Sequence, residues 1–117
     1  MARETNPNFL NGVPELLVLR LLEDEEMYGY EIVQAIRSRM GEVITAGEGV
    51  VYPVLHGLEE AGAVRSKRKT VNGRSRLYYS LTPAGRRRLE EISGVWRRVA
   101  GAIEGMLRGG RNAAGVS

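Results

Sequence analysis

The dipeptide Asn72-Gly73 constrains this chain more than any other feature, because it lies between two runs of residues that suit β-strands. Asn-Gly is the strongest short signal for a two-residue type I′ turn, which joins two antiparallel strands. With these residues as the loop, Val71 faces Arg74 and Lys69 faces Arg76, and the pairing continues along the hairpin. Because side chains alternate between the faces of a strand, the pairing predicts the face on which each side chain lies.

One predicted face of the hairpin is basic and points outward. It holds Arg65, Lys67, Lys69, Arg74, Arg76 and Tyr78. The other face holds Ser66 and Arg68, with four residues that we expect to point into the protein: Val64, Leu77, Tyr79 and Leu81. Lys69 and Arg76 oppose each other directly, at a cost on the order of tenths of a kcal/mol. The basic face therefore predicts an anionic partner, and the alternative is a lysine-guarded edge that prevents aggregation.

The charge of the chain is concentrated in its second half. Residues 1–58 carry four Arg and nine acidic residues, whereas residues 59–117 carry thirteen Lys or Arg and five acidic residues. Between Glu60 and Glu90 there are nine Lys or Arg and no acidic residue. This asymmetry favours a nucleic acid or another acidic partner for the second half, although a solvated basic surface is the plainer alternative.

Three helices are predicted ahead of the hairpin, at Val13–Glu23, Gly29–Met40 and Gly49–Glu60. Pro53 is tolerated only in the first turn of a helix, so the third helix is expected to begin at about Gly49. Residues 24–27 are predicted to be an acidic connection. Residues 42–47 are predicted to be a linker with room for a short strand.

A long helix is predicted after the hairpin, from residue 82 to about residue 108, because Thr82 is a good N-cap and Pro83 suits the first helical position. Its apolar residues recur at alternating spacings of three and four, as in a coiled-coil seam: Leu89, Ile92, Trp96, Val99, Ile103 and Met106. Such a helix is about 37 Å long, more than a domain of this size covers. We therefore predict that the seam is the interface of a homodimer. Gly109-Gly110 predicts the end of the helix and a disordered tail over residues 109–117.

The order of these elements is that of a winged helix-turn-helix, a mainly α fold with a small β-hairpin. Residues 1–81 would form the DNA-binding domain, and residues 82–108 the C-terminal dimerisation helix. In this fold the third helix presents its N-terminal turns to the major groove, and the wing lies beside phosphates. The third helix has no Arg or Lys, the residues that most often read guanine. We therefore expect mainly electrostatic affinity, with specificity from a few contacts and DNA shape; a winged-helix module that binds a protein or RNA is the alternative.

Four blocks of sequence carry a resemblance to a known family. They are YGYEI at 28–32, GVVYPVLH at 49–56, LEEAG at 58–62 and YYSLTPAG at 78–85, with Arg74 ahead of the last. In this order and at this spacing they resemble the PadR family of transcriptional regulators, over about residues 10–100. The resemblance implies a winged-helix repressor that dimerises through its last helix and, in some members, responds to phenolic acids, drugs or other small molecules. Val50 and Gly57 depart from the family pattern, which often has a small polar and a basic residue there.

The residues that we predict to contact DNA come from the second helix, the third helix and the wing: Tyr30, Val50, Tyr52, Lys67, Lys69, Arg74 and Arg76. The resemblance places Tyr30 close to DNA, with packing between helices as an equal alternative. For Tyr52 a core or capping role is the competitor. Trp96 is the only tryptophan, and some family members stack flat aromatic ligands between such residues. Trp96 is therefore a candidate ligand-binding residue, although a plain anchor of the dimer core is the alternative and both roles are compatible.

The composition argues against several other classes of protein. Without Cys there is no disulfide or thiolate chemistry, and the lone His56, expected to be an ordinary polar residue, leaves no ligand set for a structural zinc ion. No nucleophile–base pair or phosphate-cradling glycine loop is visible, so an enzyme is not expected. The apolar run 13–22 is short and interrupted by charges, which argues against a membrane span or a secretory signal. We expect a cytoplasmic protein without a cofactor, whose partners are double-stranded DNA, a second copy and a small aromatic effector.

Overall fold

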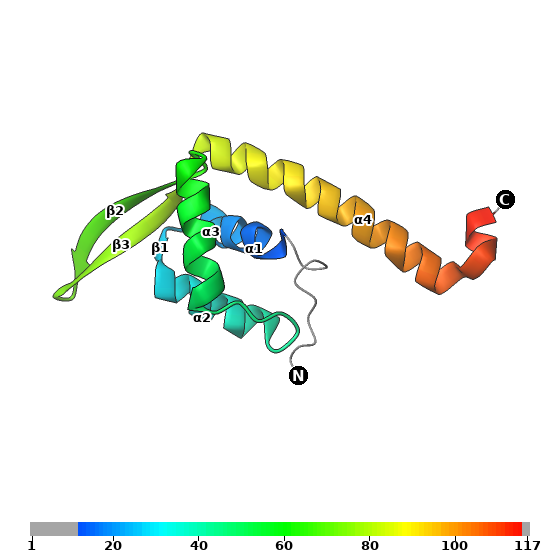
Figure 1. Ribbon diagram of the computed structural model, residues 1–117, viewed down its shortest axis with the longest axis horizontal. Coiled ribbons are helices and arrows are strands. Elements are labelled where there is room, and N and C mark those ends of the chain that lie inside the picture. Colours follow the sequence, from blue (N-terminus) through cyan, green and yellow to red (C-terminus); the bar gives the residue numbers. More distant parts are fainter. Residues whose placement is uncertain (1–11, 116–117) are drawn as a thin grey trace.

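The computed structural model describes residues 12–115, with side chains described up to residue 109. Within them, the elements follow in the order α1 (Val13–Asp24), β1 (Met27–Tyr28), α2 (Gly29–Met40), α3 (Glu48–Glu60), β2 (Val64–Val71), β3 (Arg74–Leu81) and α4 (Pro83–Gly115). Figure 1 shows that α1, α2 and α3 form a compact body, from which the β2–β3 hairpin and α4 extend in opposite directions. This is the predicted mainly α architecture with a wing and a long C-terminal helix.

The register of the hairpin confirms the prediction from the Asn-Gly turn. Val71 faces Arg74, and Lys69 faces Arg76. Asn72 and Gly73 both have positive φ, 52° and 78°, as a type I′ turn requires. The sheet has a third strand that the sequence analysis missed, because β1 pairs with β3 and gives the order β1-β3-β2. A strand of two residues is too short for alternating hydrophobicity to reveal it.

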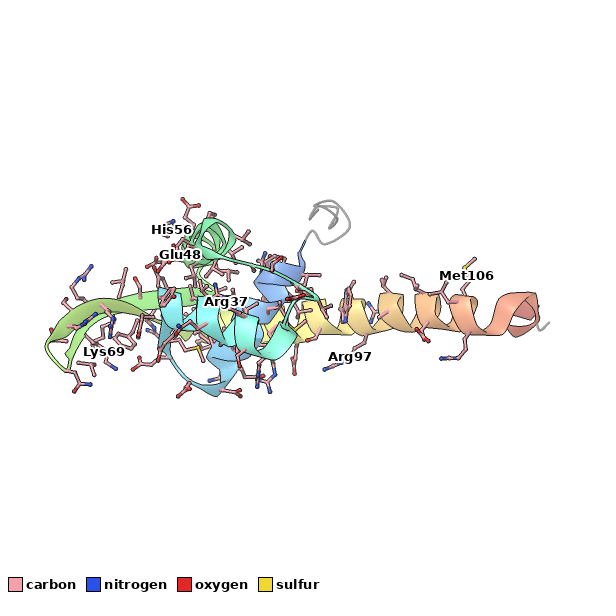
Figure 2. All side chains as sticks on the ribbon, turned by 90° about the horizontal axis from the view of Figure 1, so that it is seen from below. Arg37, Glu48, His56, Lys69, Arg97 and Met106 are labelled. Carbon is pink, nitrogen blue, oxygen red and sulfur yellow. The ribbon has the colours of Figure 1, made fainter. Side chains whose placement is uncertain are left out.

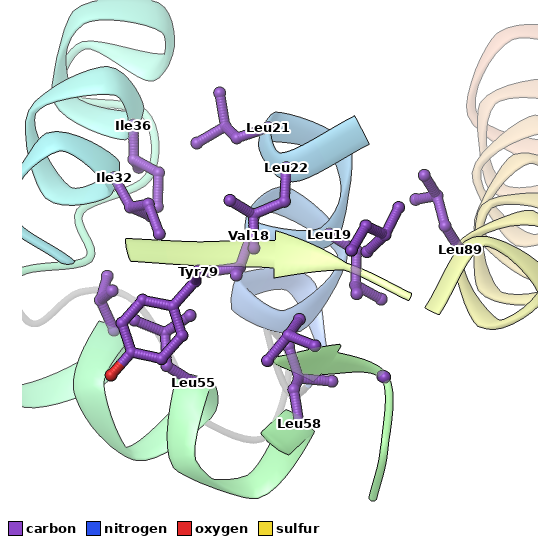
Figure 3. Close-up of a cluster of buried hydrophobic side chains, with 14 of the residues drawn as sticks. Val18, Leu19, Leu21, Leu22, Ile32, Ile36, Leu55, Leu58, Tyr79 and Leu89 are labelled. Carbon is purple, nitrogen blue, oxygen red and sulfur yellow. The ribbon is translucent and has the colours of Figure 1, made fainter. Parts of the chain in front are cut away.

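The hydrophobic core is built around α1, which packs against α2, α3, α4 and β3. Val18 and Leu19 of α1 are fully buried. Figure 3 shows the residues that meet them from the other elements: Ile32 and Ile36 of α2, Leu55 and Leu58 of α3, Tyr79 of β3 and Leu89 of α4. Burial of each such aliphatic side chain contributes roughly 1.5–3 kcal/mol, so α1 holds α2, α3, β3 and the start of α4 in one body.

The start of α4 is anchored to this body by contacts that position the wing as well. The Thr82 hydroxyl caps the helix by accepting the backbone N–H of Gly85 at 3.0 Å. The Thr82 N–H donates to the carbonyl of Ala63, also at 3.0 Å. Gly85 is tightly enclosed, since a methyl group there would lie 2.0 Å from the Ala63 oxygen. Arg88 pairs with Glu15 of α1, which raises the pKa of the Arg88 guanidinium.

Two helix boundaries differ from those expected. α3 begins at Glu48, so Pro53 is its sixth residue and lies beyond the first turn. The ring of Pro53 cannot donate to the Gly49 carbonyl, but both residues are exposed, and water can take that bond. α4 continues through the predicted stop at Gly109-Gly110 as far as Gly115. The helix can continue because each helical glycine costs only about 1 kcal/mol. The predicted disordered tail is therefore wrong over residues 109–115. Residues 116–117 lie outside the described residues.

Residues 42–47 form turns and irregular backbone, without the short strand for which they had room. Within residues 12–115, none of the helices combines the length and the apolarity that a membrane crossing needs.

Candidate nucleic-acid interface

The wing, defined as residues 64–81, carries six Arg or Lys and no acidic residue. The register divides these residues between two faces. The outer face carries Arg65, Lys67, Lys69, Arg74 and Arg76, and the inner face carries Arg68. The inner face turns towards α3, because the Ser66 hydroxyl donates to the Glu59 carboxylate of α3 at 2.7 Å. The wing is therefore basic on both faces.

Two of the predicted DNA contacts on the outer face are held by neighbours. Lys69 pairs with Glu26, and its Nζ lies 4.9 Å from the centre of the Tyr78 ring. The guanidinium of Arg76 lies 4.1 Å from the centre of the Tyr28 ring. Figure 2 shows Lys69 on the side of the sheet opposite to His56 and Glu48 of α3. The shared outer face is confirmed by the register, but Lys69 does not point to the side on which α3 is exposed.

Lys67 and Arg74, the other predicted wing contacts, are exposed. No described carboxylate pairs with either of them within residues 12–109. They are thus available to phosphates without first breaking an ion pair.

The exposed surface of α3 offers few hydrogen-bond donors, as its sequence predicted. Val50 is exposed in the first turn of α3, two residues after the acidic Glu48. Tyr52 is half-buried and packs against the start of α2, where a methyl group on Gly29 would lie 2.4 Å from its Cε1 atom. Tyr52 therefore packs inside the protein, as the alternative interpretation expected, and only part of its ring is exposed.

Tyr30 lies in the first turn of α2 and is 42% exposed. Tyr28, two residues earlier, is the N-cap of the helix, and its backbone N–H donates to the Glu31 carboxylate at 3.2 Å. The N-terminal turn of α2 is thereby presented at the surface beside α3 and the wing. This position suits a phosphate contact, because the first N–H groups of a helix have no partner inside it.

A cleft of about 510 Å³ lies between the inner face of the wing, α3 and the start of α2. Its aromatic lining consists of Tyr28, Tyr30, Tyr52 and Tyr79. Arg68 of the inner face and His56 of α3 supply polar groups, and Arg76, whose guanidinium lies over the Tyr28 ring, borders the cleft. None of the described residues that line it is acidic. Burial raises the pKa of the Tyr79 hydroxyl, with smaller contributions from Glu59 and Tyr52, so this hydroxyl stays protonated and can donate.

The cleft brings together three of the predicted site residues, Tyr30, Tyr52 and Arg76. The predicted Val50, Lys67, Lys69 and Arg74 lie outside it. Sequence reasoning missed Arg68 and treated His56 as an ordinary surface residue. The hairpin register did assign Arg68 to the inner face. It could not reveal that at Arg68 this face no longer packs against the core and borders a cleft instead.

The apolar seam of α4 divides into a covered part and an open part. Leu89 is only 5% exposed and belongs to the core of its own chain, whereas Ile92 is partly buried, packs against that core and lines the groove beside Trp96. Beyond them, Trp96 is 46% exposed and Met106 78%. The open stripe also includes Val99 and Ile103, and the seam prediction overlooked Val95 and Leu107 beside it. A groove of about 350 Å³ runs between Trp96 and the start of α1.

Both the sequence and the fold are similar to those of known proteins. The model of the transcriptional regulator PadR-like family matches residues 18–91. The transcriptional regulator Rv3488 of Mycobacterium tuberculosis is 37% identical over 83 residues, which are 71% of this chain and 75% of that protein.

Two solved structures share the fold. The PadR-like transcriptional regulator BC4206 from Bacillus cereus has a TM-score of 0.76 and 30% identity, over 87% of this chain and 98% of that one. A PadR family transcription regulator from Clostridium difficile has a TM-score of 0.74 and 30% identity, over 82% and 99%. These relatives confirm the winged-helix fold and a role in transcription through DNA binding, not catalysis. The chain therefore belongs to the PadR-like family of transcriptional regulators.

Proposed function

We propose that this protein is a cytoplasmic repressor that binds a palindromic DNA operator as a homodimer, and that a flat aromatic ligand at Trp96 releases it. The observation that carries DNA binding is the wing: six basic and no acidic residues beside the exposed N-terminal turns of α3 and α2. Basic residues that meet phosphates release counterions, which is the main source of affinity for a duplex.

The proposed contacts follow from which side chains are accessible. Val50 and the free edge of Tyr52 would enter the major groove with the N-terminal turns of α3. Tyr30, Lys67 and Arg74 would contact the backbone, together with Lys69 and Arg76 once these leave their partners in the protein. Because α3 has no Arg or Lys, the sequence preference of the DNA would rest on few base contacts and on DNA shape.

The homodimer is supported by the open stripe of α4. Trp96, Val99, Ile103 and Met106 are exposed and follow one another along about 15 Å of α4. Burial of a large apolar side chain contributes roughly 1.5–3 kcal/mol, so a second copy that covers this stripe is strongly favoured over solvent. Two-fold pairing would then set the spacing of the two α3 helices at about one turn of DNA, roughly 34 Å.

The ligand part of the proposal rests on the half-exposed indole and the groove beside it. Trp96, Val95 and Val99 form one wall, and Val13 and Leu16 of α1 form the other. A flat aromatic molecule could stack on the indole there. It would release DNA only by binding more tightly to the dimer that is unable to hold the operator.

Selection from a pool of random duplex DNA tests the proposal. A repressor of this kind should enrich a palindromic motif with two equal half-sites. Enrichment of no motif, together with retention of RNA or of a protein, would support the alternative of an interaction module. A reporter gene behind the selected motif should be silenced by the protein, and activation would refute the repressor.

A further inference from the structure

We infer that the cleft between α3 and the wing seats one phosphate group, with Arg68 and the Tyr79 hydroxyl as its donors. The inference rests on the proposed DNA binding and adds a specific contact to it. A backbone phosphodiester of the bound duplex is the source that we assign. A free phosphate compound would offer the same chemistry and is distinguished below.

The floor of the cleft holds a donor without a partner. Tyr79 is only 3% exposed, yet it lines the cleft. Figure 3 shows its ring beside Leu55 in the hydrophobic cluster. Among residues 12–109, the Tyr79 hydroxyl has no hydrogen-bond partner in the structure. Buried hydroxyls are rarely left unpaired, so a group that enters the cleft is expected to accept this hydrogen bond.

Arg68 supplies the charge on the wall of the cleft. Its Nη1 donates to the Ser75 hydroxyl across the hairpin at 3.3 Å, which holds the side chain on the inner face. The guanidinium keeps further N–H groups for a ligand. Lys69 is neutralised by Glu26 and Arg88 by Glu15, whereas no described carboxylate within residues 12–109 pairs with Arg68.

The surroundings select for a phosphate. The first turn of α2, at Gly29 and Tyr30, borders the cleft with the positive end of a 12-residue helix. Glu59 accepts from the Ser66 hydroxyl and Glu31 from the Tyr28 N–H, and both keep their negative charge. The attraction for an anion therefore comes from the Arg68 guanidinium and the helix terminus. Donors thus converge from the wing, the floor and a helix terminus, which suits an oxyanion with several acceptor oxygens.

The position of the cleft identifies DNA as the source. The N-terminal turns of α3 are the part of this fold that enters the major groove. Because the inner face of the wing, α3 and the start of α2 border one cleft, we infer that a backbone of the engaged duplex passes this face. Arg68 faces that side, whereas Lys69 points to the opposite side of the sheet from His56 of α3. The inner face would therefore hold the strand nearest to α3.

The test compares three variants of the full chain for binding to a mixed-sequence DNA duplex, with anisotropy measured across a salt series. Tyr79→Phe should bind about tenfold more weakly, the usual value of a hydrogen bond to a charged group. Its thermal midpoint should not fall, because an unpaired hydroxyl contributes nothing to folding. Arg68→Gln should reduce the salt slope by about 1. Arg39→Gln, the same change in the last turn of α2, should leave the slope unchanged.

Each contrary result has a separate meaning. If the Tyr79→Phe and Arg68→Gln variants bind the duplex like the parent chain, with the same slope, the cleft holds no phosphate and the inference is overturned while DNA binding stands. If the parent binds no duplex, the proposed function fails. Titration of that parent with inorganic phosphate, followed by the Gly29 and Tyr30 amide resonances, then separates the sources. Saturating shifts there would assign the cleft to a free phosphate compound and overturn the assignment to DNA.

Discussion

The contact between Gly29 and Tyr52 gives a quantitative prediction about how α2 and α3 are held together. Gly29 is buried at the start of α2, and its φ is not in the left-handed region, so an alanine there meets no backbone strain. The added methyl would lie 2.4 Å from Cε1 and 2.5 Å from the hydroxyl oxygen of Tyr52. The ring must therefore move, and it borders the cleft.

The magnitude follows from two opposing effects. Overpacking of a tight contact costs about 1–3 kcal/mol. Replacement of a helical glycine by alanine returns up to about 1 kcal/mol through helix propensity. Gly29→Ala should therefore lower the free energy of unfolding by about 0–2 kcal/mol, with about 1 kcal/mol at the centre of this range. DNA affinity should fall as well, because Tyr52 is displaced.

The assay is urea unfolding at one protein concentration, with a double-mutant cycle to Tyr52→Leu. In the Tyr52→Leu background the obstructing ring is gone, so Gly29→Ala should be neutral or stabilising. Gly57→Ala is the matched control, because Gly57 lies inside α3 with no atom within 4 Å of an added methyl, and it should stabilise by up to about 1 kcal/mol. Equal effects of Gly29→Ala in both backgrounds would refute the contact.

Three further predictions concern the wing, the α4 stripe and the buried tyrosine. Glu26→Gln should release Lys69 and raise the affinity for any duplex by up to about fivefold, by anisotropy; unchanged affinity would remove Lys69 from the DNA contact. Ile103→Asp should give a monomer in sedimentation equilibrium while the exposed Arg97→Asp stays dimeric, and a dimeric Ile103→Asp would place the interface elsewhere. Because burial raises the folded pKa of Tyr79, the free energy of unfolding does not depend on the titration of this group below about pH 10, where an unfolded tyrosine is protonated, and it falls as the pH rises from there through the folded pKa. Tyr79→Phe should lose less stability above pH 10 in urea titrations, and an identical loss would show that Tyr79 does not titrate differently on folding.

The elements that sequence reasoning located correctly are those determined by local chemistry. The Asn72-Gly73 turn determines the pairing of every residue in the hairpin, so its register was predictable. Thr82 caps α4 because its hydroxyl needs only the helix that follows it. α2 likewise spans the predicted Gly29–Met40.

The errors arise where a position depends on a distant part of the chain. Leu89 continues the heptad of Trp96, and spacing alone cannot show that it is buried in the core of its own chain. β1 exists because β3 has a free edge beside it, which no pattern within Met27–Tyr28 reveals. The exposure of Lys69 depends on Glu26, 43 residues away. Tertiary contacts of this kind decide which basic residues of the wing are available.

The central claim is that two copies of this chain, joined through α4, place two α3–wing units on one duplex. Hydroxyl-radical footprinting on the selected operator, together with the mass of the complex, tests it most directly. The account predicts two chains per duplex and two equal protected half-sites, with centres about 34 Å apart on one side of the DNA. One chain per duplex, or a single protected patch, would contradict it.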